Sequence, residues 1–93
     1  METTHRIFAF IVSGKVVIKR DVISEWGKHD EESITIRYAL SEEAMIRSLI
    51  HQVLYFLFSD KSEYFILNEE DRVFESLNMD QYTQLTNFLA SIS

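Results

Sequence analysis

The chain has 93 residues, a formal net charge of −6 and a hydrophobic fraction of 46%, a composition typical of a folded domain and not of a disordered chain. The absence of cysteine excludes a disulfide, a thiol nucleophile and a cysteine-ligated zinc site. Residues 48–93 hold two basic and seven acidic residues, and a field of that sign argues against direct binding of nucleic acid.

The first twenty residues predict a β-hairpin. Residues 6–12 are apolar and rich in β-forming side chains on both alternating faces, which is typical of a central strand. A two-residue break that contains Gly14 separates them from a second such run, residues 15–19. The apolar runs are too short for a signal peptide or a membrane-spanning helix, so we expect a soluble, cytoplasmic protein.

The middle of the chain predicts a short helix, an acidic loop and a strand. Apolar side chains in residues 21–27 fall at helical spacing, and Gly27 is suited to end that turn of helix. Residues 29–32 read as an exposed acidic loop. Residues 34–40 alternate between apolar and other side chains, the period of a half-buried strand.

A long helix is predicted over residues 42–59. Ser41 is placed to cap it, and Glu42 and Glu43 lie at the positive end of its dipole. Its second half, residues 53–58, is apolar all round and must therefore be covered on every side. Either the sheet and the last helix cover it within the monomer, or a second subunit does. We favour the second arrangement, a homodimer, whose interface would include Leu54, Tyr55 and Phe58.

The remainder predicts two more strands and a final helix. Residues 64–67 read as a strand, and residues 68–77 as a hairpin in preference to a short helix. Asn78 and Gln81 form a capping box at the start of the last helix. The expected fold over residues 1–93 is a single small α+β domain. It has a mainly antiparallel sheet of about four to five strands packed by two helices, in the order β-β-(short α)-β-α-β-β-α.

No motif in the sequence predicts a catalytic, cofactor-binding or metal site. Residues 13–16 lack the glycine and the hydroxyl of a phosphate-binding loop, and the three histidines are not spaced for a shared metal ion. His51 lies on one helix face with Arg47 and Tyr55. Two interpretations stand: a polar edge of the helix, or a pocket that recognises an anion.

We therefore expect a small acidic module without enzymatic activity that acts as an inhibitor, regulator or adaptor by occupying the surface of another protein. The partner-binding acids would be Glu69, Glu70, Asp71 and Glu75, which would face basic residues of the partner. A specific form of this hypothesis is a phage- or plasmid-type inhibitor that blocks the cationic groove of a nucleic-acid-binding host protein, by analogy of size and charge alone. The alternative is a small-ligand-binding or enzymatic domain with a pocket between sheet and helix, where Arg37 and Arg47 would hold an anion.

Overall fold

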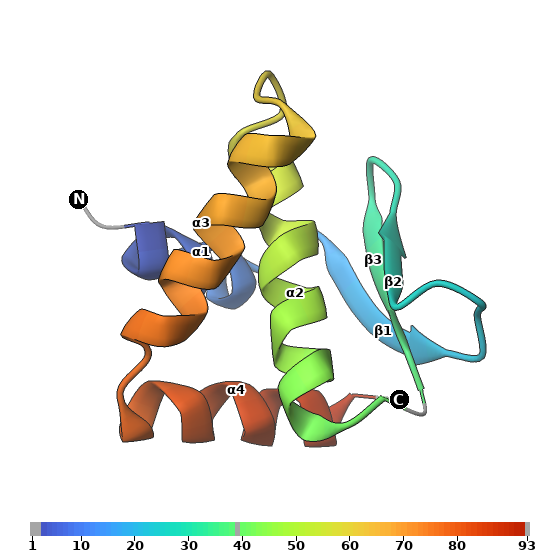
Figure 1. Cartoon of the computed structure of the whole chain (residues 1–93). Helices are drawn as coiled ribbons and strands as arrows, with labels where there is room; N and C mark the ends of the chain where they lie inside the picture. Colours follow the sequence, from blue (N-terminus) through green and yellow to red (C-terminus); the bar gives the residue numbers. More distant parts are fainter. Residues whose placement is uncertain (1–2, 39, 93) are drawn as a thin grey trace.

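The fold consists of three strands followed by three helices, with a further helix at the start. The computed structural model describes residues 3–38 and 40–92 (Figure 1). The elements in chain order are α1 (Thr3–Ser13), β1 (Val17–Asp21), β2 (Gly27–His29), β3 (Ser33–Arg37), α2 (Glu42–Leu57), α3 (Glu63–Ser76) and α4 (Met79–Ser91). Helix α2 runs through the middle, with α1 and α3 on one side, the sheet on the other and α4 across one end (Figure 1).

The sheet is small and mixed. Its strand order is β1-β3-β2, with β3 parallel to β1 and antiparallel to β2. Ile34 and Ile36 of the central strand are fully buried. A tight turn joins β2 to β3, and in it Asp30 Oδ1 accepts the backbone N–H groups of Glu32 and Ser33, both at 2.8 Å. These hydrogen bonds to its charged form hold the pKa of Asp30 below its usual value, with the Glu32 amide as the largest cause.

The hydrophobic core surrounds α2, because this helix is packed by elements from every part of the chain. Side chains of the other elements close around it, and the fully or almost fully buried ones on α1, α3 and α4 are Ile7, Ile66, Val73, Leu85 and Leu89. On α2 itself, Ile46, Leu49, Ile50, Val53 and Leu54 have no exposed surface. Ala44, Ser48 and Gln52 are buried as well, so buried residues occupy more than half of the helix circumference.

The predicted fold was wrong in the number of strands and in the type of sheet. Three strands form one mixed sheet, in place of four to five mainly antiparallel strands, and four helices pack with it in place of two. Three segments account for the difference: residues 6–12, residues 21–27 and residues 64–77.

The predicted first strand, residues 6–12, lies within helix α1. An apolar run on both faces fits a buried strand or a buried helix equally, so its alternation did not decide the matter. In the helix, Thr4 and Ile7 are buried and Ile11 packs on the core, which is helical spacing. Gly14, expected in a hairpin turn, instead ends α1 with a φ of 68°, a left-handed conformation that favours glycine.

The predicted short helix at residues 21–27 is also absent. Asp21 ends β1, a loop follows, and Gly27 begins β2. Trp26, expected to pack on a helix face, is 55% exposed. Gly27 does not have a positive φ in this structure, so its role is not to end a helix.

The predicted strand at residues 64–67 and the hairpin at residues 68–77 form one helix, α3. Ser62 caps it by accepting the backbone N–H of Phe65 at 3.2 Å. Its buried positions are Ile66, Glu69 and Val73, which is helical spacing. Glu69, in the middle of these buried positions, interrupts the apolar spacing that would have indicated a helix. A carboxylate is seldom buried unless it is paired, so Glu69 was not expected on a buried face.

Other predicted elements are confirmed. Ser41 caps α2 through the backbone N–H of Ala44, at 3.2 Å. Asn78 and Gln81 form both hydrogen bonds of the capping box at the start of α4. Residues 17–19 and 34–37 are strand residues as expected, in β1 and β3. Position 39, within the predicted strand 34–40, lies outside the described residues.

The apolar end of α2 is covered in part within the chain. Phe56 packs on Phe10 of α1, with ring centroids 5.3 Å apart. Phe58 packs on Phe65 of α3, with ring centroids 5.2 Å apart. The guanidinium of Arg6 lies over the Phe58 ring at 5.0 Å. Contacts within the chain thus cover this apolar end in part, and residues 55–58 remain half-buried. The homodimer stays a prediction.

None of the helices within residues 3–38 and 40–92 is both long and apolar enough to cross a membrane.

Candidate functional site

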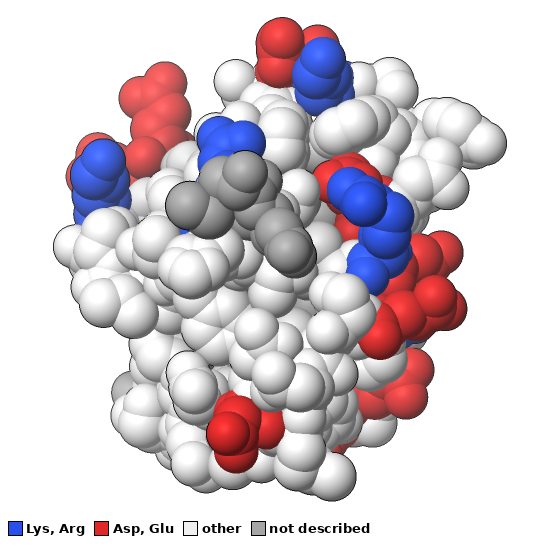
Figure 2. Space-filling view, turned by 90° about the vertical axis from the view of Figure 1, so that its left-hand side faces the viewer, with Lys and Arg blue, Asp and Glu red and all other residues white. Residues whose placement is uncertain are grey.

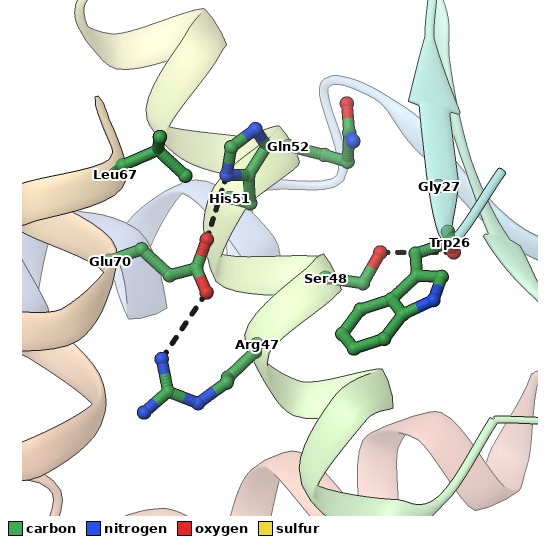
Figure 3. Close-up of a pocket in the computed structure, with 8 residues that line it drawn as sticks. All are labelled: Trp26, Gly27, Arg47, Ser48, His51, Gln52, Leu67 and Glu70. Carbon is green, nitrogen blue, oxygen red and sulfur yellow. Dashed lines mark hydrogen bonds and ion pairs between the residues drawn. The ribbon is translucent and has the colours of Figure 1, made fainter. Parts of the chain in front are cut away.

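A pocket of about 320 Å³ opens between β2, α2 and α3 (Figure 3). Its floor is one face of α2, formed by Arg47, Ser48, His51 and Gln52. Its walls come from the segment around β2 on one side and from α3 on the other, and are formed by Trp26, Gly27, Leu67 and Glu70. Its volume lies near the lower end of the range for sites that bind small molecules or single side chains.

Glu70 contacts two basic side chains of the pocket floor, Arg47 and His51. Its Oε2 accepts from Arg47 Nη1 at 3.3 Å, and its Oε1 is 2.7 Å from His51 Nδ1 (Figure 3). The Glu70 side chain is only 15% exposed, so both contacts lie in a partly desolvated place. A carboxylate in such a place orients the imidazole as well as the guanidinium.

More carboxylates surround this network. Arg47 also pairs with Asp71 at 2.7 Å and with Glu43 at 3.5 Å, and Glu63 lies 3.7 Å from His51 Nε2. The hydrogen bond that Arg47 donates to Asp71 raises the pKa of Arg47, and the hydrogen bond to Glu70 adds to that effect. The guanidinium also lies over the Phe74 ring, at 4.2 Å from its centroid. Four carboxylates thus contact one guanidinium and one imidazole. Only Glu70 among them lines the pocket, so the excess of negative charge lies around the pocket.

The two walls present apolar surface to solvent. Trp26 is 55% exposed and Leu67 is 48% exposed, and they stand on opposite sides of the α2 face (Figure 3). Tyr64, one turn before Leu67 on α3, is 76% exposed. An indole and a leucine left half-exposed beside a pocket are typical of a contact surface for another molecule.

Gly27 allows β2 to approach α2 closely. A Cβ at this position would overlap Ser48 Oγ and come within 3.2 Å of the Thr35 carbonyl oxygen. Ser48 Oγ in turn donates to the carbonyl oxygen of Trp26 at 3.1 Å, which fixes the wall of the pocket to its floor. The glycine is therefore needed for space and not for an unusual backbone conformation.

Replacing Gly27 by alanine is expected to lower the free energy of unfolding by about 1–3 kcal/mol, because the new methyl group displaces Ser48 and breaks its hydrogen bond to Trp26. Urea denaturation measures the change. In a Ser48→Ala background the overlapping hydroxyl is gone, so the same substitution should cost less. Equal costs in the two backgrounds would contradict this account of Gly27.

The structure brings together two of the residues that the sequence analysis proposed for an anion pocket. Arg47 and His51 both line the pocket, whereas Tyr55 packs between His51 and His29, with both pairs of ring centroids 5.0 Å apart. Arg37 lies elsewhere and donates to the carbonyl oxygen of Ser24 at 3.3 Å. Because carboxylates already surround Arg47, the pocket does not favour an anion.

The four acids proposed for partner binding occupy two kinds of position. Glu69 is buried and pairs with Arg72 at 2.8 Å and with the hydroxyl of Thr3 at 3.1 Å. Glu70 belongs to the pocket network. Asp71 and Glu75 are exposed. The acids therefore share one helix, but only Asp71 and Glu75 are exposed, and Asp71 is also paired with Arg47.

The three apolar residues proposed for the dimer interface also differ in how exposed their side chains are. Leu54 has no exposed surface, and Tyr55 and Phe58 are half-buried. Leu54 is thus a core residue of the monomer.

The sequence analysis missed Trp26, Gly27 and Leu67 as pocket residues, because it placed all three in the wrong secondary structure. Ser48 and Gln52 carried a signal that could have found them. They are polar, they lie one turn apart in the middle of α2, and both are buried in the structure. Buried polar side chains on a core helix indicate a polar contact with a neighbouring element.

Within the described residues, no group of three or more His, Asp or Glu side chains is arranged to hold a metal ion. Comparisons of the chain with protein-family models, with curated proteins and with solved structures found no match.

Proposed function

We propose that the protein is a non-enzymatic interaction module that inhibits, regulates or links a partner protein by covering a basic region of its surface. The observation that carries this proposal is the charge of α3. This helix holds five acidic residues and one basic residue, and it adjoins the pocket. Acidic side chains gather along the right-hand edge of Figure 2, which is the front of Figure 1, with basic side chains beside them.

The contacts of the pocket support binding in preference to catalysis. The Ser48 hydroxyl donates to a backbone carbonyl, and the hydrogen-bond partners of His29 and His51 are an amide and a carboxylate. In the described part of the chain, neither of these histidine contacts joins an imidazole to a hydroxyl nucleophile. The half-exposed Trp26 belongs to a residue type that is enriched at protein interfaces.

The test replaces exposed acids only. The patch variant is Glu63→Gln/Asp71→Asn/Glu75→Gln, and the control variant Glu31→Gln/Glu32→Gln/Asp80→Asn removes the same charge elsewhere. Partners captured by the parent chain are purified, and their association rates are measured by stopped flow. We expect the patch variant to associate about tenfold more slowly at low salt, and the control variant to behave like the parent.

Two outcomes carry the interpretation further. Higher salt should slow the parent more than the patch variant, because screening removes the attraction that the variant has already lost. If the partner binds nucleic acid, DNA or RNA should compete with the module for it, which is the expected behaviour of a nucleic-acid mimic. Equal association rates of the two variants would contradict the proposal, because the acids of α3 would then act only through net charge.

A further inference from the structure

We propose that the pocket between Trp26 and Leu67 accepts one arginine or lysine side chain of the partner. This inference rests on the proposed function and adds to it the chemistry of the residue that anchors the complex. Three properties of the pocket point to a long cationic side chain: its charge, the composition of its walls and the state of its hydrogen-bonding groups.

The charge around the pocket selects a cation. Glu70 lines the pocket with a side chain 15% exposed. Three more carboxylates contact its lining residues from outside: Glu43 and Asp71 at Arg47, and Glu63 at His51, with side chains 63%, 66% and 59% exposed. Arg47 offsets only one of these charges. An anionic ligand would meet this excess of carboxylates, so the pocket discriminates against it.

The walls suit the stem of such a side chain. Leu67 offers aliphatic surface on the α3 side, and Trp26 offers the face of an indole on the opposite side. A guanidinium or ammonium group is attracted to an indole ring more strongly than to other aromatic rings, and its methylene stem packs on apolar neighbours. A purely apolar side chain would pack on the walls but would lack the attraction of a cation to the indole ring. A short side chain would lack the methylene stem that packs on the walls.

The polar groups of the floor are already engaged with the protein. Ser48 Oγ donates to Trp26, and Gln52 Oε1 is 2.6 Å from His29 Nδ1. Each Glu70 oxygen receives one contact from the floor, and a carboxylate oxygen has a second lone pair for a further donor. Glu70 therefore offers acceptor sites to a cationic side chain, while Arg47 and Gln52 keep N–H groups of their own in the lining.

The experiment is an NMR titration of the intact protein with Nα-acetyl-arginine amide. Trp26 is the one tryptophan in the chain, so its indole N–H signal reports directly on the pocket. We expect a saturable shift of this signal, with a Kd in the millimolar range for so small a probe. Nα-acetyl-citrulline amide, which has nearly the same shape and no charge, should bind at least about tenfold more weakly.

A matched pair of variants locates the effect. Glu63→Gln/Asp71→Asn should weaken binding of the arginine amide by about three- to tenfold, and Glu31→Gln/Glu32→Gln, with the same change of net charge, should leave it unchanged. Because all four residues are exposed, both variants are expected to fold. Equal binding of arginine and citrulline amides, or no saturable shift at Trp26, would overturn the inference.

The two proposals fail in different ways. If the arginine amide does not shift Trp26 but the α3 patch variant still loses its partner, the pocket inference is wrong and the proposed function stands. If the arginine amide binds and the patch variant keeps its partner, the pocket is a cation site that the interaction does not use, and the proposed function is wrong.

Discussion

Replacing Leu54 by alanine is expected to lower the free energy of unfolding by about 2–5 kcal/mol, because the side chain is fully buried and its loss leaves a cavity between α2 and its neighbours. Urea denaturation followed by circular dichroism measures this change. The result also decides a functional question, because Leu54 was expected from the sequence to contact a second subunit.

Leu67→Ala is the matched control for this prediction. The same atoms are removed from a side chain that is 48% exposed beside the pocket, so the cost should stay below about 1 kcal/mol. If Leu54→Ala instead left the stability of the monomer unchanged and abolished a dimer in light scattering, Leu54 would lie in an interface and not in the core.

Replacing Glu70 by glutamine is expected to cost about 1.5–3 kcal/mol. The substitution removes the charge that Arg47 and His51 share, in a place where the carboxylate is only 15% exposed. Thermal and urea denaturation measure the loss. The cost should shrink in an Arg47→Met background, because residues in one ion-pair network are not energetically independent.

Glu75→Gln is the control, since Glu75 lies on the same helix and is exposed. Its effect on stability should stay within about 0.5 kcal/mol. Equal effects at the two positions would mean that the network around Glu70 contributes no stability. The contrast also shows why a variant in which Glu69, Glu70, Asp71 and Glu75 are all neutralised cannot test binding alone: at Glu69 and Glu70 it would weaken the fold.

Local signals in the sequence predicted the elements that depend on local contacts. Ser41 and Asn78 cap α2 and α4 as expected, because a cap is a hydrogen bond between residues three positions apart. The acidic loop before β3 and the apolar helix that begins at Glu42 follow from the same kind of short-range pattern. So does the acidic character of the second half of the chain, on which the proposed function depends.

The segments that were predicted wrongly depend on contacts distant in sequence. Glu69 is acceptable on the buried face of α3 because Arg72 and Thr3 of α1 satisfy its carboxylate, and no local pattern announces a partner 66 residues away. Residues 6–12 have side chains that suit a strand, but α2 offers them a surface that a helix fills. Tertiary contacts outweighed propensity in both places.

The sequence by itself determined the charge, the caps and the helix that forms the centre of the core, because composition and short-range hydrogen bonds are properties of neighbouring residues. Only the tertiary structure decided that Trp26, Arg47, His51, Leu67 and Glu70 share one pocket. These residues lie on three separate elements, and the close approach of β2 to α2 at Gly27 and the packing of α3 on α2 bring them together. Loop closure and packing between elements set the distances between these residues, and neither produces a periodic pattern in the sequence.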